Sequence, residues 1–550
     1  MKRINVRRYT VRQLWRLCDR ELFAVPEIQR EFVWDPRRAS DLIDSIVRQL
    51  PIGSLLIWKT SSNRKHLLRH AQEILPPHDA RNKDIWFLID GQQRLSVLYR
   101  AKHGHEVTND QGRRLNFSKL CLSFDDRHDS KFLFLRNPSP RVHAPVVDIL
   151  SSSWRRRFRH LSQRKMRQID NARQRINGYS VPVIFVETTD VDEVREAFLR
   201  INSGGLRISK ADRAFSKASR LNLRRLVKEI RNALPAGFSD LNPRTIQVAM
   251  AVIMGQKETS SKAVESVIAR LEKEEIINGK VSQRFTRDWK NITVCIQKAV
   301  DHLITEIGVL NFSFLPSELM VPILAFFFYA NNLAQPSPKQ RKEIRKWFWG
   351  TAVGRRYTGR GYYLNIRRDL MFFQRLGHRR NGTFQLRDKI PLDEIRRTDY
   401  LSSGSVGAAF FLLLASKSPR YLEGGNIIPL DSAAALGNRK DKHHIFPRAL
   451  LSRNGFTARE ANSLCNMCYF VAEENQSIGG SSAPVRYLDN YRYRRHFPGV
   501  MKSHLIPYKR DGALWGRNVR KAYRKFQRER LREISNAFNE AAGMNLFRRD

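Results

Sequence analysis

The sequence predicts an α+β protein of several domains, and three observations point to this class. With 550 residues the chain is long enough for about three or four domains. Apolar or alternating runs at residues 86–89 and 467–472 are typical of strands, whereas residues 211–420 carry apolar side chains at helical spacing. We therefore predict three domains: residues 1–210, a helical middle domain at 211–420, and residues 421–550.

The N-terminal strand at residues 86–89 runs directly into the sequence Asp-Gly-Gln-Gln-Arg at residues 90–94. Leu95 and Leu98 then follow at helical spacing, which predicts a strand, a glycine turn and the start of a helix. The N-terminus of a helix presents unpaired N–H groups to an anion, and Arg94 adds positive charge suited to a nucleotide phosphate. The alternative is that the Asp-Gly pair forms only an ordinary turn.

The middle domain is expected to consist of helices, some of them fully buried. Ile246, Ala249 and Ile253 show the helical spacing. The longest apolar runs, residues 321–330 and 406–415, fall short of the roughly 20 residues that a membrane span needs. We therefore expect buried helices and no membrane association.

The cysteine content points to the redox compartment. Five cysteines, an odd and small number, and the absence of an apolar N-terminal segment predict a reducing cytoplasm rather than a disulfide framework. Cys465 and Cys468 have the spacing of half a zinc ribbon, but no second such pair exists. We expect both thiols to lie in a protein core.

The charge of the chain predicts a polyanionic partner. Lys and Arg number 99 against 53 Asp and Glu, which gives a net charge of +46 and a pI near 10.7. Such a field attracts nucleic acid before any specific contact forms, and it does not distinguish DNA from RNA. The segment after Lys509 is rich in arginine and is expected to form a basic helix that touches the nucleic-acid backbone.

The clearest chemical signal is the pair His443 and His444, followed by Asn462, Asn466 and Asn475. Hydrolysis of a phosphodiester needs a base that deprotonates water and a cation that neutralises the phosphate. A neutral imidazole meets the first need, and imidazole or amide ligands can hold the cation. On a strand neighbouring side chains face opposite ways, so the two histidines can take different roles. The segment therefore predicts a metal-assisted nuclease site.

The structural setting expected for this site is a pair of strands. Ile445 and Phe446 are predicted to form a short strand that ends at Pro447, and residues 467–472 are predicted to form its partner. Asp441, two residues before His443, is a less favoured source of a carboxylate ligand. The alternative is a surface strand end with two hydrogen-bonded imidazoles.

Residues 443–488 resemble the C-terminal HNH (His-Me finger, ββα-metal) nuclease domain of GmrSD-type, nucleotide-dependent restriction enzymes. The resemblance comprises the sequence His-Ile-Phe-Pro, an asparagine before a strand and another after it, Pro484, and the pair Tyr487-Leu488. It implies the following roles: His444 is the general base, His443 and Asn475 are metal ligands, Asn466 orients the loop or the base, and Asn462 is a weaker candidate. His443 stands where the family more often has an aspartate, so Mg²⁺ and Mn²⁺ both stay open as the metal.

The N-terminal part resembles the ParB-like domain of the same family. The resemblance covers most of residues 4–100 and includes residues 26–34, 42–46, 51–54 and 90–94. It implies a site for a nucleoside triphosphate and its hydrolysis, lined by Asp90, Gly91, Gln92, Gln93, Arg94 and Arg30. Asn202 is a further contributor if residues 198–206 match the family's turn between helices. The alternative there is a helix C-cap followed by an N-cap at Ser209.

Together these observations predict a cytoplasmic, nucleotide-regulated HNH endonuclease that cuts phage or modified DNA with a divalent metal. The chain has no Gly-x-x-x-x-Gly-Lys-Ser/Thr sequence, so the nucleotide is expected to act as a switch rather than to drive a motor. Two alternatives stay open: a nucleotide-switched DNA-binding protein with an inactive HNH segment, and a toxin-like nuclease that cuts RNA. The sequence also leaves a homo-oligomer open.

Overall fold

The computed structural model describes residues 3–26, 32–61, 68–69, 75–79, 81–108, 114–125, 130–188, 193–194, 210–218, 221–277, 280–359, 361–378, 382–430, 442–470 and 482–548. The chain forms two compact units. Unit 1 comprises Met1–Arg224 and Leu271–Gly279, and unit 2 comprises Arg225–Arg270 and Lys280–Asp550. The mixture of helices and strands agrees with the expected α+β class. The division into three domains stays a prediction.

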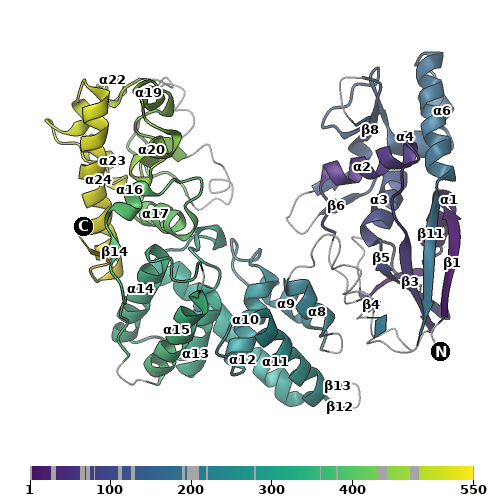
Figure 1. Ribbon diagram of the computed structural model, residues 1–550, viewed down its shortest axis with the longest axis horizontal. Coiled ribbons are helices and arrows are strands. Elements are labelled where there is room, and N and C mark those ends of the chain that lie inside the picture. Colours follow the sequence, from purple (N-terminus) through teal and green to yellow (C-terminus); the bar gives the residue numbers. More distant parts are fainter. Residues whose placement is uncertain are drawn as a thin grey trace. The chain divides into compact units, whose positions relative to one another are not determined.

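Unit 1 is built on a six-stranded mixed sheet (Figure 1). Its strands are β1 (Arg3–Thr10), β2 (Phe23–Pro26), β3 (Leu55–Ser61), β4 (Leu68–Arg69), β5 (Asp84–Asp90) and β11 (Ser180–Glu187). The order is β1-β11-β3-β5-β2-β4, in which β11 pairs parallel with β3 and β2 pairs parallel with β5. The other neighbouring strands run antiparallel.

Both faces of this sheet are covered, because its inner strands alternate two sets of apolar side chains. In β11 the side chains of Val181, Val183 and Phe185 belong to the large core of unit 1. Ile184 and Val186, which point to the opposite face, pack against a second, smaller core. The predicted strand at residues 86–89 is confirmed as part of β5.

Helices and short strands complete unit 1. The helices are α1 (Val11–Asp19), α2 (Pro36–Val47), α3 (Gln92–His103), η2 (Phe117–Lys119), α4 (Val146–Leu150), α5 (Trp154–Arg157), α6 (Gln163–Gly178) and α8 (Lys210–Ser216). The short strands are β6 (Glu106–Thr108), β7 (Arg114–Asn116), β8 (Leu120–Ser123), β9 (Phe132–Phe134) and β10 (His143–Pro145). Strand β8 lies between β10 and β9, and α2 packs against both β9 and α6.

Further elements lie along the chain where the two units alternate. They are α9 (Leu223–Asn232), α11 (Ser261–Glu274), β12 (Ile276–Ile277) and β13 (Lys280–Val281).

The first part of unit 2 is helical, as predicted for the middle of the chain. Its elements are α10 (Pro243–Ile253), α12 (Gln283–His302), η3 (Leu303–Ile307), η4 (Phe312–Phe314), α13 (Met320–Ala330), α14 (Pro338–Val353) and α15 (Tyr362–Gly377). Helix α13 is apolar on nearly all sides and contacts α10, α12 and α15, so it forms the centre of this bundle. No helix in the described part of the chain combines the length and the apolar character that crossing a membrane requires.

The rest of unit 2 contains the predicted nuclease segment. Its elements are β14 (Ile390–Pro391), α16 (Asp393–Arg397), α17 (Gly404–Ser416), β15 (Lys442–His444), α19 (Arg448–Arg453), α20 (Ala458–Ala461), η6 (Leu464–Asn466), β16 (Met467–Tyr469), α22 (Pro484–Tyr487), α23 (Phe497–Ser503), η7 (Ala513–Trp515), α24 (Val519–Ala542) and β17 (Phe547–Arg548). The predicted buried helix at residues 406–415 is confirmed as α17.

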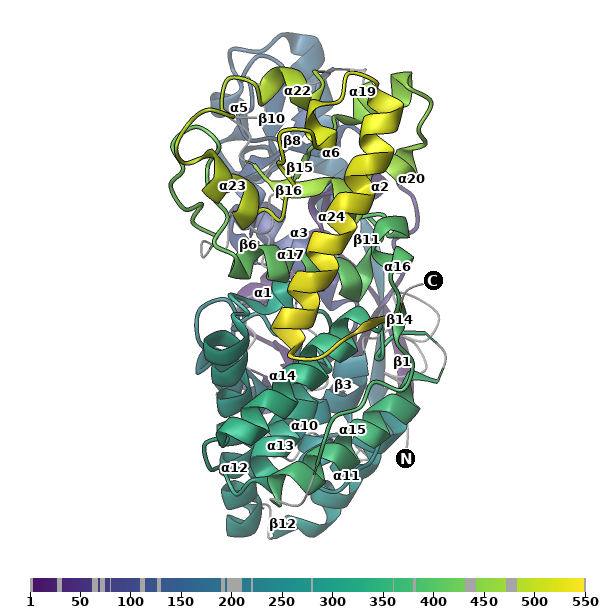
Figure 2. The same cartoon turned by 90° about the vertical axis from the view of Figure 1, so that its left-hand side faces the viewer.

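The long basic helix α24 links the two parts of unit 2. Its start is capped by the side chain of Asn518, and it ends at Gly543, whose φ of 62° suits a residue without a Cβ. It contacts α14 and α17 (Figure 2). It also contacts η6 and η7. Its apolar side, which includes Tyr523 and Phe526, packs against Phe446 of the predicted nuclease segment. Helix α24 therefore fixes the nuclease segment onto the helical bundle.

Candidate functional site

Strands β15 and β16 form an antiparallel pair that carries the two histidines. His443 lies opposite Cys468, and His444 lies opposite Met467. The prediction that Ile445 and Phe446 form the first strand is wrong by a few residues, because β15 covers Lys442–His444 and ends before them. The reason is a set of side-chain hydrogen bonds that hold the backbone of Ile445 and Phe446 in a bend.

Asn466 and Tyr487 hold this bend. The side-chain oxygen of Asn466 accepts a hydrogen bond from Phe446 N at 2.8 Å, and its amide nitrogen donates to the carbonyl oxygens of Phe446 and Ala461. The hydroxyl of Tyr487 donates to Ile445 O at 2.7 Å. Asn466 is fully buried, so the amide replaces the strand ladder as the partner of these backbone groups. This geometry is consistent with its predicted role of orienting the loop.

His444 is held by a chain of polar side chains. Its Nε2 lies 3.0 Å from Oδ1 of Asn462, and Nδ2 of Asn462 donates to Oδ2 of Asp399 at 3.4 Å. Because an amide oxygen can only accept, Nε2 carries the proton and Nδ1 has the free lone pair. Within the described residues Nδ1 forms no hydrogen bond. The Tyr400 ring and the imidazole form a T-shaped pair, with centroids 5.6 Å apart.

The surroundings of His444 favour its neutral form. Burial lowers the pKa of this histidine below its ordinary value, and the charge of Arg448 lowers the pKa further. The hydrogen bond to Asn462 and the charge of Asp399 oppose this shift. The net direction is downward, so His444 is an imidazole with an available lone pair at neutral pH. Such a group can act as a general base.

His443 faces different residues from His444. Only 4% of its surface is exposed, and its ring lies 5.6 Å from that of Phe470. The ring of His504 also contacts Phe470, with the two ring centroids 4.8 Å apart. Burial lowers the pKa of His504 to about 4, and its Nε2 donates to Arg420 O at 2.9 Å. His504 is therefore a neutral, fixed side chain near the first histidine.

The described residues supply part of the predicted donor set for a metal. Asn475 and Asp441 lie outside them. Among the described residues, no group of three or more His, Cys, Asp or Glu side chains is arranged to hold a metal ion. The described donor is the imidazole of His443, whose chemistry suits Mn²⁺ or a softer ion better than Mg²⁺, which prefers oxygen ligands.

A fully buried arginine of α24 binds the backbone of the segments next to this site. Arg530 donates to four backbone carbonyl oxygens, those of Cys465, Met467, His504 and Leu505, at 2.6 to 3.2 Å. Burial lowers the pKa of this guanidinium to about 10, so it stays charged at neutral pH. The arginine ties η6, β16 and the turn after α23 to one helix. As expected, the thiols of Cys465 and Cys468 are buried in the core of this part of the protein.

The predicted strand, glycine turn and helix at residues 90–94 are confirmed in unit 1. Gly91 has φ of 89° and directly precedes α3. Arg94 donates to Oδ2 of Asp90 at 2.7 Å and to Ile52 O at 2.8 Å. A Cβ on Gly91 or on Gly53 would collide with Leu55 or with the Arg94 guanidinium, respectively. Gly53 therefore allows the arginine to lie against the turn, and Gly91 allows the turn to pack closely on Leu55.

The two glutamines of the turn are buried. Gln93 accepts a hydrogen bond from Val33 N at 2.9 Å, which ties the turn to the segment before α2. Gln92 is 3% exposed. Arg30 and Asn202, the other residues predicted to line a nucleotide site, lie outside the described residues. The structure thus brings together Asp90, Gly91 and Arg94 as a single strand-to-helix corner.

Residues 12–218 match the family model of the GmrSD restriction endonuclease, N-terminal domain. The corner of β5 and α3 lies within this GmrSD N-terminal domain match, which supports a GmrSD-type restriction endonuclease family. The matched region covers most of unit 1 and does not include the segment with His443 and His444.

A second comparison covers most of the chain. The uncharacterized protein MJ0686 of Methanocaldococcus jannaschii is 22% identical over 516 residues, which cover 84% of this chain and 83% of that protein. The similarity therefore extends beyond the GmrSD N-terminal domain match into unit 2.

Sequence reasoning missed Asp399, Tyr400, His504 and Arg530. Asp399 lies 63 positions before Asn462, in a segment without any motif, and Arg530 is one of many arginines in a basic helix. The spacing of α24 gives one weak signal for Arg530, because Tyr523, Phe526 and Arg530 lie on the same face. No comparable local signal marks Asp399.

Proposed function

We propose that this chain is a metal-dependent DNA endonuclease that restricts phage or modified DNA, with its cutting centre at His444. One observation carries the proposal: Nε2 of His444 is bound to Asn462, which leaves Nδ1 as the nitrogen that can take a proton from water. The GmrSD N-terminal domain match supports a restriction-type function. The net charge of +46 supports a polyanionic substrate.

The residues of the chain divide the work of hydrolysis as follows. Nδ1 of His444 accepts the proton of the attacking water, while Asn462 and Asp399 keep the ring in the correct tautomer and orientation. Asn466 holds the bend that follows His444 in the chain. When bound through His443 and Asn475, a divalent ion supplies positive charge to the phosphate and to the departing 3′ oxygen.

Basic side chains near the site would hold the DNA backbone. The positive charge of Arg448 lowers the pKa of His444. The charges of Arg524 and Arg396 lower the pKa of Glu460, which lies two residues from Asn462. The hydroxyl of Tyr523 donates to Glu460 O at 2.6 Å, so α24 is fixed against α20. Guanidinium groups suit phosphate oxygens, because their donors form a planar fork.

For unit 1 we propose a site that binds and hydrolyses a nucleoside triphosphate and thereby regulates the nuclease; it comprises Asp90, Gly91, Gln92, Gln93 and Arg94, with Arg30. Support comes from the corner of β5 and α3, where a helix without a side-chain cap begins. The Arg94 guanidinium is held by the Asp90 carboxylate and by Ile52 O, so its position beside the start of α3 is fixed.

A cleavage assay with the full chain tests the proposed function. Supercoiled plasmid and a matched RNA are incubated with Mn²⁺ or Mg²⁺, with and without ATP or GTP, on plain and on modified DNA. We expect metal-dependent nicking of DNA that falls about 100-fold or more in His444→Ala, because general-base catalysis contributes at least that much. His160→Ala, which changes an exposed histidine of unit 1, is the matched control.

The other outcomes identify the alternatives. If the parent binds DNA but never cuts any substrate with either metal, the chain is a DNA-binding protein with an inactive HNH segment. The replacement of the usual aspartate by His443 is the observation that favours this alternative. If RNA is cut and DNA is not, the chain is a ribonuclease. Equal cutting by His444→Ala and the parent would show that another residue is the base.

A further inference from the structure

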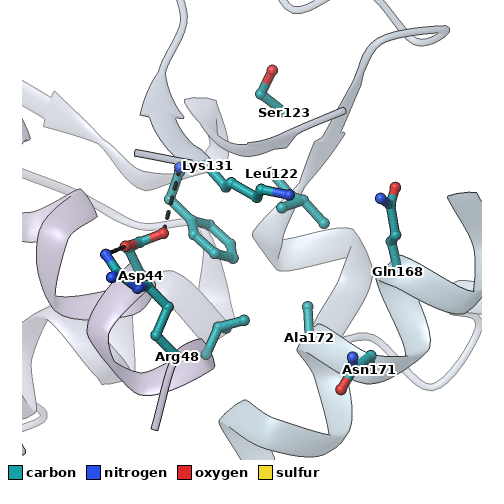
Figure 3. Close-up of a pocket in the computed structure, with 10 residues that line it drawn as sticks. Asp44, Arg48, Leu122, Ser123, Lys131, Gln168, Asn171 and Ala172 are labelled. Carbon is teal, nitrogen blue, oxygen red and sulfur yellow. Dashed lines mark hydrogen bonds and ion pairs between the residues drawn. The ribbon is translucent and has the colours of Figure 1, made fainter. Parts of the chain in front are cut away.

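Unit 1 contains a cavity of about 430 Å³ that the proposed function does not use. It lies between α2, strand β8, the start of β9 and helix α6 (Figure 3). Its described lining includes no residue of the corner at residues 90–94. Its size falls within the range of roughly 300 to 1,000 Å³ that is typical of sites for small organic ligands.

The lining combines an apolar part with polar groups from three elements. Leu122, Phe132 and Ala172 are buried and give the cavity its apolar wall. Gln168 and Asn171 contribute side-chain amides from α6. Within the described part of the chain these two amides form no hydrogen bond, so their donors and acceptors are open to a ligand or to water.

Asp44 supplies a nearly buried carboxylate. Its side chain is 12% exposed; it accepts from Lys131 N at 3.4 Å and pairs with Arg48 Nη1 at 3.5 Å. Both contacts are long, and a carboxylate has about four acceptor sites. It can therefore accept further hydrogen bonds. Arg48 and Lys131 are exposed members of the lining and add positive charge.

A second, more open hollow of about 660 Å³ shares Asp44 and Arg48 with this cavity. It is lined by residues of α2, among them Arg37, Ser40 and Ser45, and by Leu133 and Phe134 of β9. The Asp44–Arg48 pair therefore lines both hollows. A ligand with a compact ring and a phosphate could place the ring in the smaller cavity and the phosphate near Arg48.

We infer that this cavity binds one nucleotide, with the base inside and its phosphate at Arg48 and Lys131. A nucleobase offers amino donors to Asp44 and a mixed donor and acceptor edge to the amides of Gln168 and Asn171. Enzymes that read an extruded base use such a combination of apolar walls and edge contacts. A metal ion would need more than the one carboxylate that Asp44 supplies, and inorganic phosphate would leave the apolar wall unused. The nucleotide is either free or a base turned out of a DNA strand.

The experiment measures binding rather than cutting, so it is independent of the proposed nuclease activity. The full chain carries His444→Ala and is kept in EDTA. The probes are the four deoxynucleoside 5′-monophosphates and a labelled duplex with one unpaired nucleotide, compared with the fully paired duplex. Asn171→Trp fills the mouth of the cavity from an exposed helix position, and Gln168→Ala removes one amide. Gln174→Trp, at an exposed position of α6 outside the lining, is the matched control.

We expect both cavity variants to weaken binding about tenfold or more, because one fills the space for the base and the other removes a polar contact to its edge, while Gln174→Trp binds like the parent. Loss confined to the monophosphates identifies a free nucleotide, and loss confined to the duplex with an unpaired nucleotide identifies a DNA base. The inference fails if the parent binds none of the probes beyond the paired duplex, or if Asn171→Trp and Gln168→Ala both bind all of them as the parent does.

Discussion

The imidazole of His444 is held by the side chain of Asn462, with Nε2 of the histidine 3.0 Å from Oδ1 of the asparagine. Asp399, from a segment far away in sequence, holds the other end of the same amide. The contact with Asn462 leaves Nδ1 of His444 as the ring nitrogen with a free lone pair. Asn462, a weaker candidate from the sequence, therefore orients the proposed base. The proposed orientation of His444 can therefore be tested by substituting Asn462 and Asp399.

Asn462→Ala should lower the rate of DNA nicking about 10- to 100-fold, because the imidazole loses the partner that fixes its tautomer. Single-turnover cleavage at saturating DNA measures the effect on the chemical step. Asn536→Ala, which changes an exposed asparagine of α24, is the control. An unchanged rate in Asn462→Ala would mean that the observed contact does not orient the base.

The pH at which nicking is half-maximal should depend on the charged residues near His444. A general base works in its neutral form, so the rate falls as the pH drops through its pKa. Burial lowers that pKa, so this fall should lie below the ordinary histidine range. Asp399→Asn removes a charge that raises the pKa and should move the fall to lower pH. Arg448→Gln removes a charge that lowers the pKa and should move it to higher pH.

These two opposite shifts distinguish electrostatic control from structural damage. A misfolded variant would lose rate at every pH without moving the midpoint. Shifts of the same sign in Asp399→Asn and Arg448→Gln would contradict the assignment of His444 as the titrating base.

The ratio of the nicking rates with Mn²⁺ and Mg²⁺ should depend on the residue at position 443. An imidazole ligand favours Mn²⁺ over Mg²⁺, so we expect the parent chain to nick faster with Mn²⁺. His443→Asp supplies an oxygen ligand and should raise the ratio of the Mg²⁺ rate to the Mn²⁺ rate. Circular dichroism checks that this buried substitution still folds. A ratio that is identical in both proteins would remove His443 from the metal site.

Asn466→Ala should open the bend that follows His444. The substitution leaves buried backbone groups of Phe446 and Ala461 without partners, at a cost of about 1–3 kcal/mol for each. Native-state hydrogen exchange at the Phe446 amide measures the local opening directly, which matters because a chain of two units need not unfold in one step. Asn454→Ala, which removes a single side-chain hydrogen bond to Leu450 O, should have a smaller effect. Unaltered exchange at Phe446 would contradict the proposed role.

The exposed arginines of α24 should contribute to the salt dependence of DNA binding. Arg524, Arg528 and Arg532 are exposed and recur every four residues, so they form one stripe. Replacing Arg524 and Arg528 with glutamine should reduce the slope of log affinity against log salt by about 0.9 for each phosphate that these arginines neutralise. Arg284→Gln with Arg287→Gln, two exposed arginines of α12, is the control. Equal slopes in the parent and in the α24 variant would exclude this stripe from the interface.

Much of the fold could be predicted from local patterns. The strand β5, the turn at Gly91 and the helix α3 follow from neighbouring residues, as do the buried helices α13 and α17. The end of β15 could not be predicted, because Ile445 and Phe446 look like strand residues. The side chain of Asn466, 20 positions away, decides their conformation.

The sequence by itself determined the strongly basic character of the chain, its α+β class and the adjacency of His443 and His444. These properties depend on composition, on periodicity or on covalent neighbours. Only the tertiary structure decided that Asn462 and Asp399 hold His444, that Arg530 is buried beneath β16, and that α2 and α6 enclose a cavity. Such contacts join residues separated by tens of positions, and they form only when the apolar faces of distant elements pack together.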